Sequence, residues 1–240
     1  MKLREIYNIL DNISPFELQE GWDNSGVNIG DLNRDIEEIY ISLEVTKEIL
    51  EEAREDSLFI VHHPLIFSPL KSLDFTKYPS NLLEIMAKKS ISLIALHTNF
   101  DKTHLNRYVF EKILEFKIEK ERDFILESKI DISSNELFKL LKERLNLEHL
   151  RVVNRKDKID SIALTTGSGA SLIDEVESSC FLTGDIKYHD AMKAKSKNLM
   201  LVDIGHFESE VFFSSILKEE LENLGIFAII CRLKNPFEIV

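Results

Sequence analysis

Three short stretches of the chain combine histidine and carboxylate residues in a way that could bind metal. They lie at residues 61–67, 97–101 and 203–210, and they contain four of the seven histidines. Imidazoles together with carboxylates bind divalent ions such as zinc, iron, manganese and nickel. The residue types therefore predict a divalent metal centre, without indicating which metal it holds.

Each stretch comes directly after an apolar segment with the composition of a β-strand. These segments are residues 58–61, 92–96 and 199–202. In an open α/β sheet, ligands bind in the crevice outside the carboxyl ends of the strands. We therefore expect residues that are far apart in the sequence to be neighbours at this edge.

The adjacent pair His62-His63 stands at the end of the first of these segments. Neighbouring side chains of an extended backbone point to opposite faces, so the pair cannot easily chelate one ion. The two rings can reach two ions if the backbone turns, and Pro64 favours such a turn. The alternative is a pair of strand-end histidines bonded to backbone carbonyls.

The second stretch offers His97 and Asp101. Asp101 is the stronger ligand candidate, because the two oxygens of a carboxylate can bridge two ions; alternatively it caps the next helix. His97 is either a ligand or a residue that orients one. In the third stretch, His206 and Glu210 are four residues apart at the start of a predicted helix, so they share one face.

Two glycine-containing loops are weaker candidates. The loop at 167–169 precedes a predicted helix and either offers amides to an anion or is a plain turn. The loop at 183–189 ends in His189, which is either a substrate contact or general acid, or a structural residue. His104 and His149 have no such neighbours and are expected at the surface.

Composition limits the classes of function. The 240 residues carry 42 acidic and 30 basic side chains and a net charge of −12, which disfavours a general nucleic-acid surface. The first residues lack the apolar centre of a signal peptide, and no apolar run reaches the roughly 20 residues of a membrane span. We expect a soluble, cytoplasmic protein, with Cys180 and Cys231 as small core residues.

Hydrophobic periodicity predicts an α/β fold in which strands and helices alternate. A more charged excursion at 117–160 interrupts the alternation, so we expect two α/β halves with mixed or parallel sheets, divided into residues 1–122 and 123–240, with the metal site between them at the strand ends. The predicted helices are 3–13, 46–54, 78–89, 105–115, 135–145, 170–177, 187–196 and 207–223. The predicted strands are 39–43, 58–61, 91–96, 124–126, 150–153, 159–164, 180–183, 199–204 and 226–232.

Six motifs are distinctive in combination. They are Trp22-Asp23-Asn24-Ser25-Gly26, Ser42-Leu43-Glu44-Val45-Thr46, His62-His63-Pro64-Leu65-Ile66-Phe67, His97-Thr98-Asn99-Phe100-Asp101, the loop from Thr183 to His189, and Gly205-His206-Phe207-Glu208-Ser209-Glu210. Together these motifs resemble the dinuclear-metal, hexameric family named after the yeast Ngg-interacting factor three, whose members are often labelled GTP cyclohydrolase I type 2 homologues. The resemblance covers nearly the whole chain, and one departure is Glu44, where the family usually has aspartate.

The resemblance implies two divalent ions per subunit, and rings of six subunits built as trimers of dimers. It also implies a metal-dependent hydrolase in which activated water opens the guanine ring of GTP and releases formate. A phosphoesterase acting on a phosphorylated small molecule and a non-catalytic, ring-shaped metal-binding or adaptor protein are the alternatives. The implied ligands are His62, His63, Asp101, His206 and Glu210.

Overall fold

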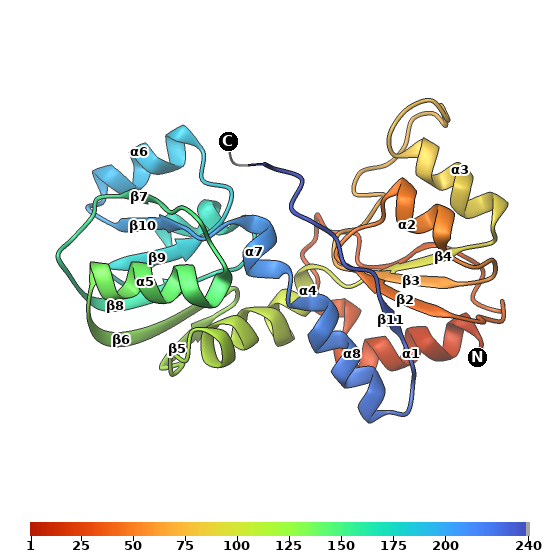
Figure 1. Ribbon diagram of the computed structural model, residues 1–240, viewed down its shortest axis with the longest axis horizontal. Coiled ribbons are helices and arrows are strands. Elements are labelled where there is room, and N and C mark those ends of the chain that lie inside the picture. Colours follow the sequence, from red (N-terminus) through yellow and green to blue (C-terminus); the bar gives the residue numbers. More distant parts are fainter. Residues whose placement is uncertain (239–240) are drawn as a thin grey trace. The chain divides into compact units, whose positions relative to one another are not determined.

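The computed structural model describes residues 1–238, which form two compact units. Unit 1 contains Met1–Phe100 and the described residues from Phe213 onward, and unit 2 contains Asp101–Phe212. Each unit has one mixed β-sheet with helices packed on it, which confirms the α/β fold class (Figure 1). The units do not coincide with the expected division at 122/123.

The sheet of unit 1 has five strands, in the order β1-β4-β3-β2-β11. The inner strands β2, β3 and β4 run parallel, β11 extends the sheet parallel to β2, and β1 pairs antiparallel with β4. All residues of β2, β3 and β4 are buried, as expected for strands covered on both faces. The strand bounds are β1 Gly26–Ile29, β2 Ile39–Ser42, β3 Leu58–Val61, β4 Ser92–Ala95 and β11 Ile229–Ile230.

Helices lie on both faces of this sheet (Figure 1). Helix α1 buries Leu3, Ile6 and Leu10 at helical spacing, as the sequence predicts. Helices α2 and α3 cover the face opposite to α1 and α8. The helix bounds are α1 Leu3–Ile13, α2 Lys47–Glu52, α3 Ser80–Lys88, α4 Thr98–Phe100 and α8 Phe213–Asn223, with a short 3₁₀ turn at Phe16–Leu18.

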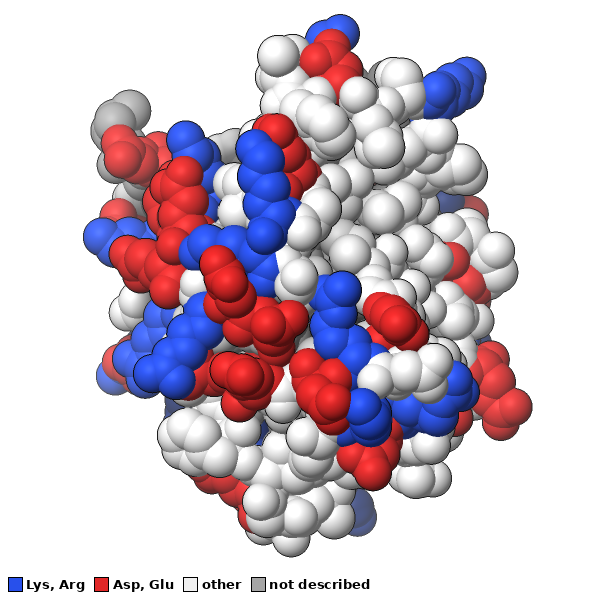
Figure 2. Space-filling view, turned by 90° about the vertical axis from the view of Figure 1, so that its right-hand side faces the viewer, with Lys and Arg blue, Asp and Glu red and all other residues white. Residues whose placement is uncertain are grey.

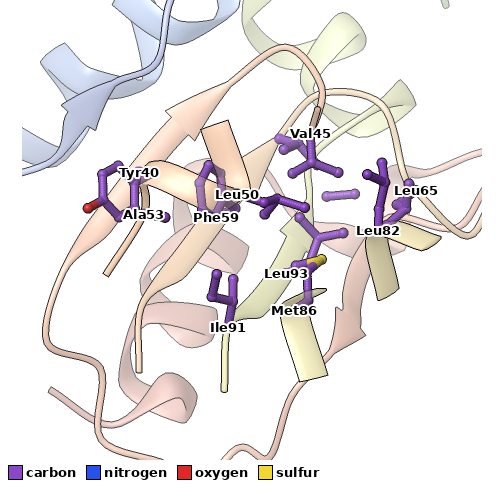
Figure 3. Close-up of a cluster of buried hydrophobic side chains, with 12 residues drawn as sticks. Tyr40, Val45, Leu50, Ala53, Phe59, Leu65, Leu82, Met86, Ile91 and Leu93 are labelled. Carbon is purple, nitrogen blue, oxygen red and sulfur yellow. The ribbon is translucent and has the colours of Figure 1, made fainter. Parts of the chain in front are cut away.

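The core beneath α2 and α3 holds the strand ends in place. Leu50 of α2 and Met86 of α3 pack against Phe59 of β3 and Leu93 of β4, and all four side chains are fully buried (Figure 3). Burying side chains of this size stabilises the fold by about 1.5–3 kcal/mol each. The carboxyl ends of β3 and β4, which precede the histidines, are therefore rigidly supported.

The sheet of unit 2 has six strands, in the order β5-β6-β8-β9-β10-β7. Strands β8, β9 and β10 are parallel, whereas β5, β6 and β7 pair antiparallel with their neighbours. The charged segment 117–160, which interrupts the predicted alternation of strands and helices, thus supplies β5, β6 and β7, the antiparallel strands of this sheet. The bounds are β5 Lys120–Arg122, β6 Ile125–Ser133, β7 Arg151–Val153, β8 Lys158–Leu164, β9 Cys180–Thr183 and β10 Met200–Asp203.

Unit 2 also has helical elements around its sheet. Helix α5 begins with a capping box between Ser133 and Glu136, which satisfies the first amides of the helix. Ile173 and Ala194 pack with Phe181 and Leu201 in the core of this unit. The bounds are α5 Ser134–Leu145, α6 Tyr188–Ser196 and α7 His206–Glu210, with a 3₁₀ helix at Gly169–Asp174 and π-helical turns at Asp101–Leu105 and Tyr108–Ile113.

Several expected elements differ from the structure. The predicted helix 105–115 is largely π-helical, the helix at 170–177 is a 3₁₀ segment, and the strand at 226–232 is paired only at β11. The predicted helix 207–223 is two helices, α7 and α8, because the chain passes from unit 2 to unit 1 between them.

The division into units has a cause in long-range pairing. Strand β11 pairs with β2, which draws the end of the chain into unit 1. The Asn106 side chain accepts hydrogen bonds at 2.8 Å from the amide and hydroxyl groups of Thr166, which binds the segment after Phe100 to unit 2. Contacts between residues so far apart in the sequence leave no local pattern. The expected division at 122/123, which follows a change in composition along the chain, therefore does not reflect them.

Charged side chains are mixed over the face shown in Figure 2. Lys and Arg lie among Asp and Glu there, and no continuous basic surface covers this face. Within residues 1–238, no helix is both long enough and apolar enough to cross a lipid bilayer. Both cysteines are free thiols; Cys180 is buried, and desolvation raises its pKa to about 12, whereas Cys231 is half-buried.

Candidate metal centre

Unit 1 brings His62, His63 and His97 together. One nitrogen from each ring lies within 4.8 Å of the others, a spacing that could hold a metal ion. The cause is the parallel pairing of β3 with β4, which sets Val61 opposite Ala95 and so brings both strand ends to one edge. The sequence prediction that these two stretches meet is therefore correct.

Hydrogen bonds fix the rings of the adjacent pair. The Nδ1 of buried His62 lies 2.9 Å from the carbonyl oxygen of Leu96, and the Nδ1 of His63 lies 3.2 Å from Oε1 of Glu44. A ring whose Nδ1–H donates to an oxygen has Nε2 as its metal-binding atom. Both rings are thus oriented as Nε2 ligands, and the Glu44 carboxylate can orient the His63 ring.

His97 is held by a buried carboxylate. Its Nδ1 lies 2.8 Å from Oδ1 of Asp23, whose side chain is fully buried. The other oxygen of Asp23 accepts hydrogen bonds from the Thr98 amide and hydroxyl and from the Ser25 hydroxyl. Burial by itself would raise the pKa of Asp23. The hydrogen bond and positive charge of His97, together with the hydrogen bond from Thr98, instead hold the pKa of this carboxyl group well below its usual range. Asp23 therefore remains an anion that orients the His97 ring.

Unit 2 brings together His206, Glu210 and Asp101. His206 and Glu210 share one face of α7, and Nε2 of the histidine lies 2.9 Å from Oε2 of the glutamate. A carboxylate oxygen of Asp101 lies within 4.8 Å of one from Glu210. The Nδ1 of His206 lies 2.6 Å from Oδ2 of Asp185, the same arrangement of carboxylate and imidazole as in unit 1. The expected geometry of the His206 and Glu210 pair is confirmed.

Gly167 has a structural role that was not among the two interpretations of its loop drawn from the sequence. It has a φ of +60°, and a Cβ at this position would collide with the Glu210 carboxylate. Its amide donates to the Ser209 hydroxyl at 3.0 Å, and that hydroxyl donates to the His206 carbonyl at 2.9 Å. Gly167 therefore leaves room for Glu210 and links the loop after β8 to α7.

The remaining histidines are placed elsewhere. His189 is exposed at the start of α6, its ring edge-on to Tyr188, and it belongs to none of the ion-holding groups found among the described residues. His149 is exposed and His104 is half-buried. The candidate role of His189 as a substrate contact or general acid stays a prediction.

The donor sets fit a divalent ion. The three imidazoles of unit 1, and the imidazole and carboxylates of unit 2, are donors that suit first-row transition metals, and each well-oriented ring has an oxygen acceptor behind it. Asp23 and Asp185, the acceptors behind His97 and His206, lie in loops with no local signal for this role. The histidine and glutamate groups can therefore bind a metal.

The profile of Duf34/NIF3 (NGG1p interacting factor 3) matches residues 1–235, nearly the whole chain. This chain belongs to the Duf34/NIF3 family. The resemblance inferred from the motifs is thereby confirmed.

Two bacterial relatives are similar in sequence to this Duf34/NIF3 protein over nearly their full lengths. The chain is 48% identical over 239 residues to the GTP cyclohydrolase 1 type 2 homolog of Campylobacter jejuni, with 99% of each chain covered. It is 42% identical over 240 residues to the GTP cyclohydrolase 1 type 2 of Helicobacter pylori, again with 99% of each covered. The crystal structure of Staphylococcus aureus hypothetical protein SA1388 has the same fold, with a TM-score of 0.88 at 24% identity, covering 100% of this chain and 99% of that one.

Proposed function

We propose that this Duf34/NIF3 protein is a dinuclear metal-dependent hydrolase that opens the guanine ring of GTP. His62, His63, Asp101, His206 and Glu210 hold two divalent ions in this proposal. The observation that carries it is the ring orientation: each of the three histidines has its Nδ1 against an oxygen, so that Nε2 is the coordinating atom. Five ligands are more than one ion with an open catalytic position requires.

Two divalent ions would lower the pKa of a water molecule and polarise the bond that it attacks. Water attacks C8 of the guanine ring, a ring carbon–nitrogen bond breaks to leave a formamide, and hydrolysis of the formamide releases formate. His97 takes a proton from the attacking water at Nε2 and gives it to the departing nitrogen, while the Asp23 carboxylate holds Nδ1–H and stabilises the imidazolium between the two transfers. His97 stands close to the ligands, with ring centroids 5.1 Å from His62 and 5.5 Å from His63.

The choice of GTP rests on relatives. The Helicobacter pylori relative, at 42% identity, is named GTP cyclohydrolase 1 type 2, and the Campylobacter jejuni relative is named a homolog of it. We also propose a cytoplasmic homohexamer, a trimer of dimers, as the resemblance to the family implies; such an assembly has the closed symmetry that soluble homo-oligomers generally adopt. Light scattering that gave a monomer mass at every concentration would contradict this assembly.

The test is an assay of metal-reconstituted protein. Zinc, iron, manganese and nickel forms are incubated with GTP and with a generic phosphoester, and formate and phosphate are both measured. Formate from GTP without phosphate supports the proposal. Phosphate from either substrate identifies a phosphoesterase, and two bound ions without turnover identify a metal-binding protein.

Elemental analysis tests the ligands. The wild type should contain about two ions per chain, since five ligands are available. Asp101→Asn keeps the shape but removes the negative charge, and it should lose at least one ion. His149→Ala, at an exposed position, should keep the wild-type content. An Asp101→Asn variant that kept both ions at wild-type affinity would exclude Asp101 as the bridge.

A further inference from the structure

Two large aromatic side chains of unit 1 stand in solvent beside the histidines. Trp22 is 59% exposed and Phe67 is 49% exposed. Their ring centroids are 5.9 Å apart, and their planes are inclined at 53°. The His97 ring lies 6.2 Å from Trp22 and 6.3 Å from Phe67, edge-on to both. The three rings thus surround one point next to His62 and His63.

Hydrogen bonds hold the backbones beside these rings. The Asn24 side chain donates to the Ile66 carbonyl at 2.6 Å, which links the Trp22 loop to the residue before Phe67. The Asn28 side chain accepts from the Ile66 amide at 3.4 Å, so both backbone polar groups of Ile66 are bonded. On the other side, Asp23 is anchored through His97 and Thr98. The aromatic pair is therefore preorganised, although its rings contribute little to the core.

Exposed aromatic rings on a fixed backbone are suited to stacking. Base–aromatic stacking strengthens binding by roughly fivefold to a hundredfold per base and tolerates any base, because every base has a π-face. A fixed backbone reduces the entropy lost on binding. The position beside His97 explains why a planar ring should bind here rather than at other exposed aromatics such as Phe75, which has the same 49% exposure.

We propose that Trp22 and Phe67 form a stacking site for the planar nitrogen heterocycle of the substrate and position that ring against His97. This inference rests on the proposed function for the identity of the ring, guanine. It extends that function by assigning the residues that select an aromatic substrate. Trp22 and Phe67 are positioning residues, and they take no part in proton transfer.

Trp22 is the sole tryptophan of the chain, so its fluorescence reports directly on this site. Metal-loaded protein is titrated with guanosine, GTP and inorganic tripolyphosphate, using N-acetyltryptophanamide to correct for absorbed light. We expect saturable quenching by guanosine and by GTP, because stacking on the indole requires only the ring. Tripolyphosphate, which has the charges without the ring, should leave the emission unchanged.

Two variants separate stacking from general effects. Phe67→Leu should weaken guanosine binding by roughly tenfold, the loss expected for one stacking partner. Phe75→Leu, an equally exposed phenylalanine of the same connection between β3 and α3, should bind guanosine like the wild type. Trp22→Leu removes the signal, so its affinity is measured by equilibrium dialysis, and it should fall by a similar factor.

Quenching by tripolyphosphate equal to that by guanosine would overturn the proposal, and so would unchanged affinity in Phe67→Leu and Trp22→Leu. Acrylamide quenching provides a further check. If acrylamide reached the Trp22 indole only after the protein was diluted, a second copy of the chain would cover Trp22, and the proposal would be overturned. The proposed function fails separately: saturable guanosine stacking without formate release retains the stacking site and rejects the cyclohydrolase. Formate release without guanosine stacking would retain the cyclohydrolase and reject the stacking site.

Discussion

At the scale of single residues, the recurring feature is a histidine whose Nδ1 is held by an oxygen. Glu44, Asp23 and Asp185 play this part for His63, His97 and His206. Such a partner fixes both the tautomer and the ring plane and makes Nε2 a better ligand or base. Substitution of the carboxylates that bond to the rings should therefore affect the site, just as substitution of the histidines would.

Asp185→Asn should weaken metal binding by about tenfold, because a neutral amide supports the His206 ring less well than a carboxylate does. Asparagine tolerates the φ of 54° at this position, so the backbone should be unaffected. Asp56→Asn is the matched control, since Asp56 is also exposed and has a φ of 53°. Metal titration by competition with a chromogenic chelator measures both affinities, and equal values would remove Asp185 from the site.

His97→Gln should retain both ions and lose turnover by roughly a hundredfold or more, as expected when a general acid is removed. The reason is that His97 is assigned to proton transfer rather than to coordination. His104→Gln, a half-buried histidine of unit 2, should have wild-type activity. Elemental analysis beside the formate assay decides the role: loss of an ion from His97→Gln would make His97 a ligand.

At the scale of elements, much of the fold could be predicted from the sequence. Strands β3, β4 and β10 are short, buried apolar runs, and their carboxyl ends carry the predicted site residues. The pairs Asp23–His97 and Asp185–His206 could not be predicted, because they join loops distant in sequence. The break between α7 and α8 was also missed, since a continuous helical pattern runs across it.

The loop after β8 supports a prediction about Gly167. Gly167→Ala should lower metal affinity, because the new methyl group would displace the Glu210 carboxylate. It should also lower the unfolding free energy by about 1–2 kcal/mol through its left-handed backbone. Gly225→Ala separates the two effects, since Gly225 has a φ of +77° with open space at the Cβ position.

Thermal unfolding and metal titration of both glycine variants provide the comparison. Gly225→Ala should share the loss of stability but keep wild-type metal affinity. If Gly167→Ala bound metal as tightly as Gly225→Ala, the Glu210 carboxylate would not depend on the space that this glycine leaves.

At the scale of the whole molecule, the proposed ligands come from both compact units. His62 and His63 belong to unit 1, whereas Asp101, His206 and Glu210 belong to unit 2. The expected division at 122/123 placed Asp101 with the first half, and no sequence pattern marked the return of β11 to unit 1. Ions bound to these ligands would stabilise the folded chain, which has a consequence for unfolding.

Chelation should therefore lower the thermal midpoint of the wild type. An ion present at a hundred times its dissociation constant stabilises the native state by about 2.7 kcal/mol, provided that the unfolded chain does not bind it. Scanning calorimetry before chelation, after chelation and after metal is restored measures the change. Asp101→Asn, which should have lost an ion already, should respond less to the chelator. An identical thermogram for the wild type in all three states would mean that no ion stabilises the folded chain, and the assignment of the five ligands would then be rejected.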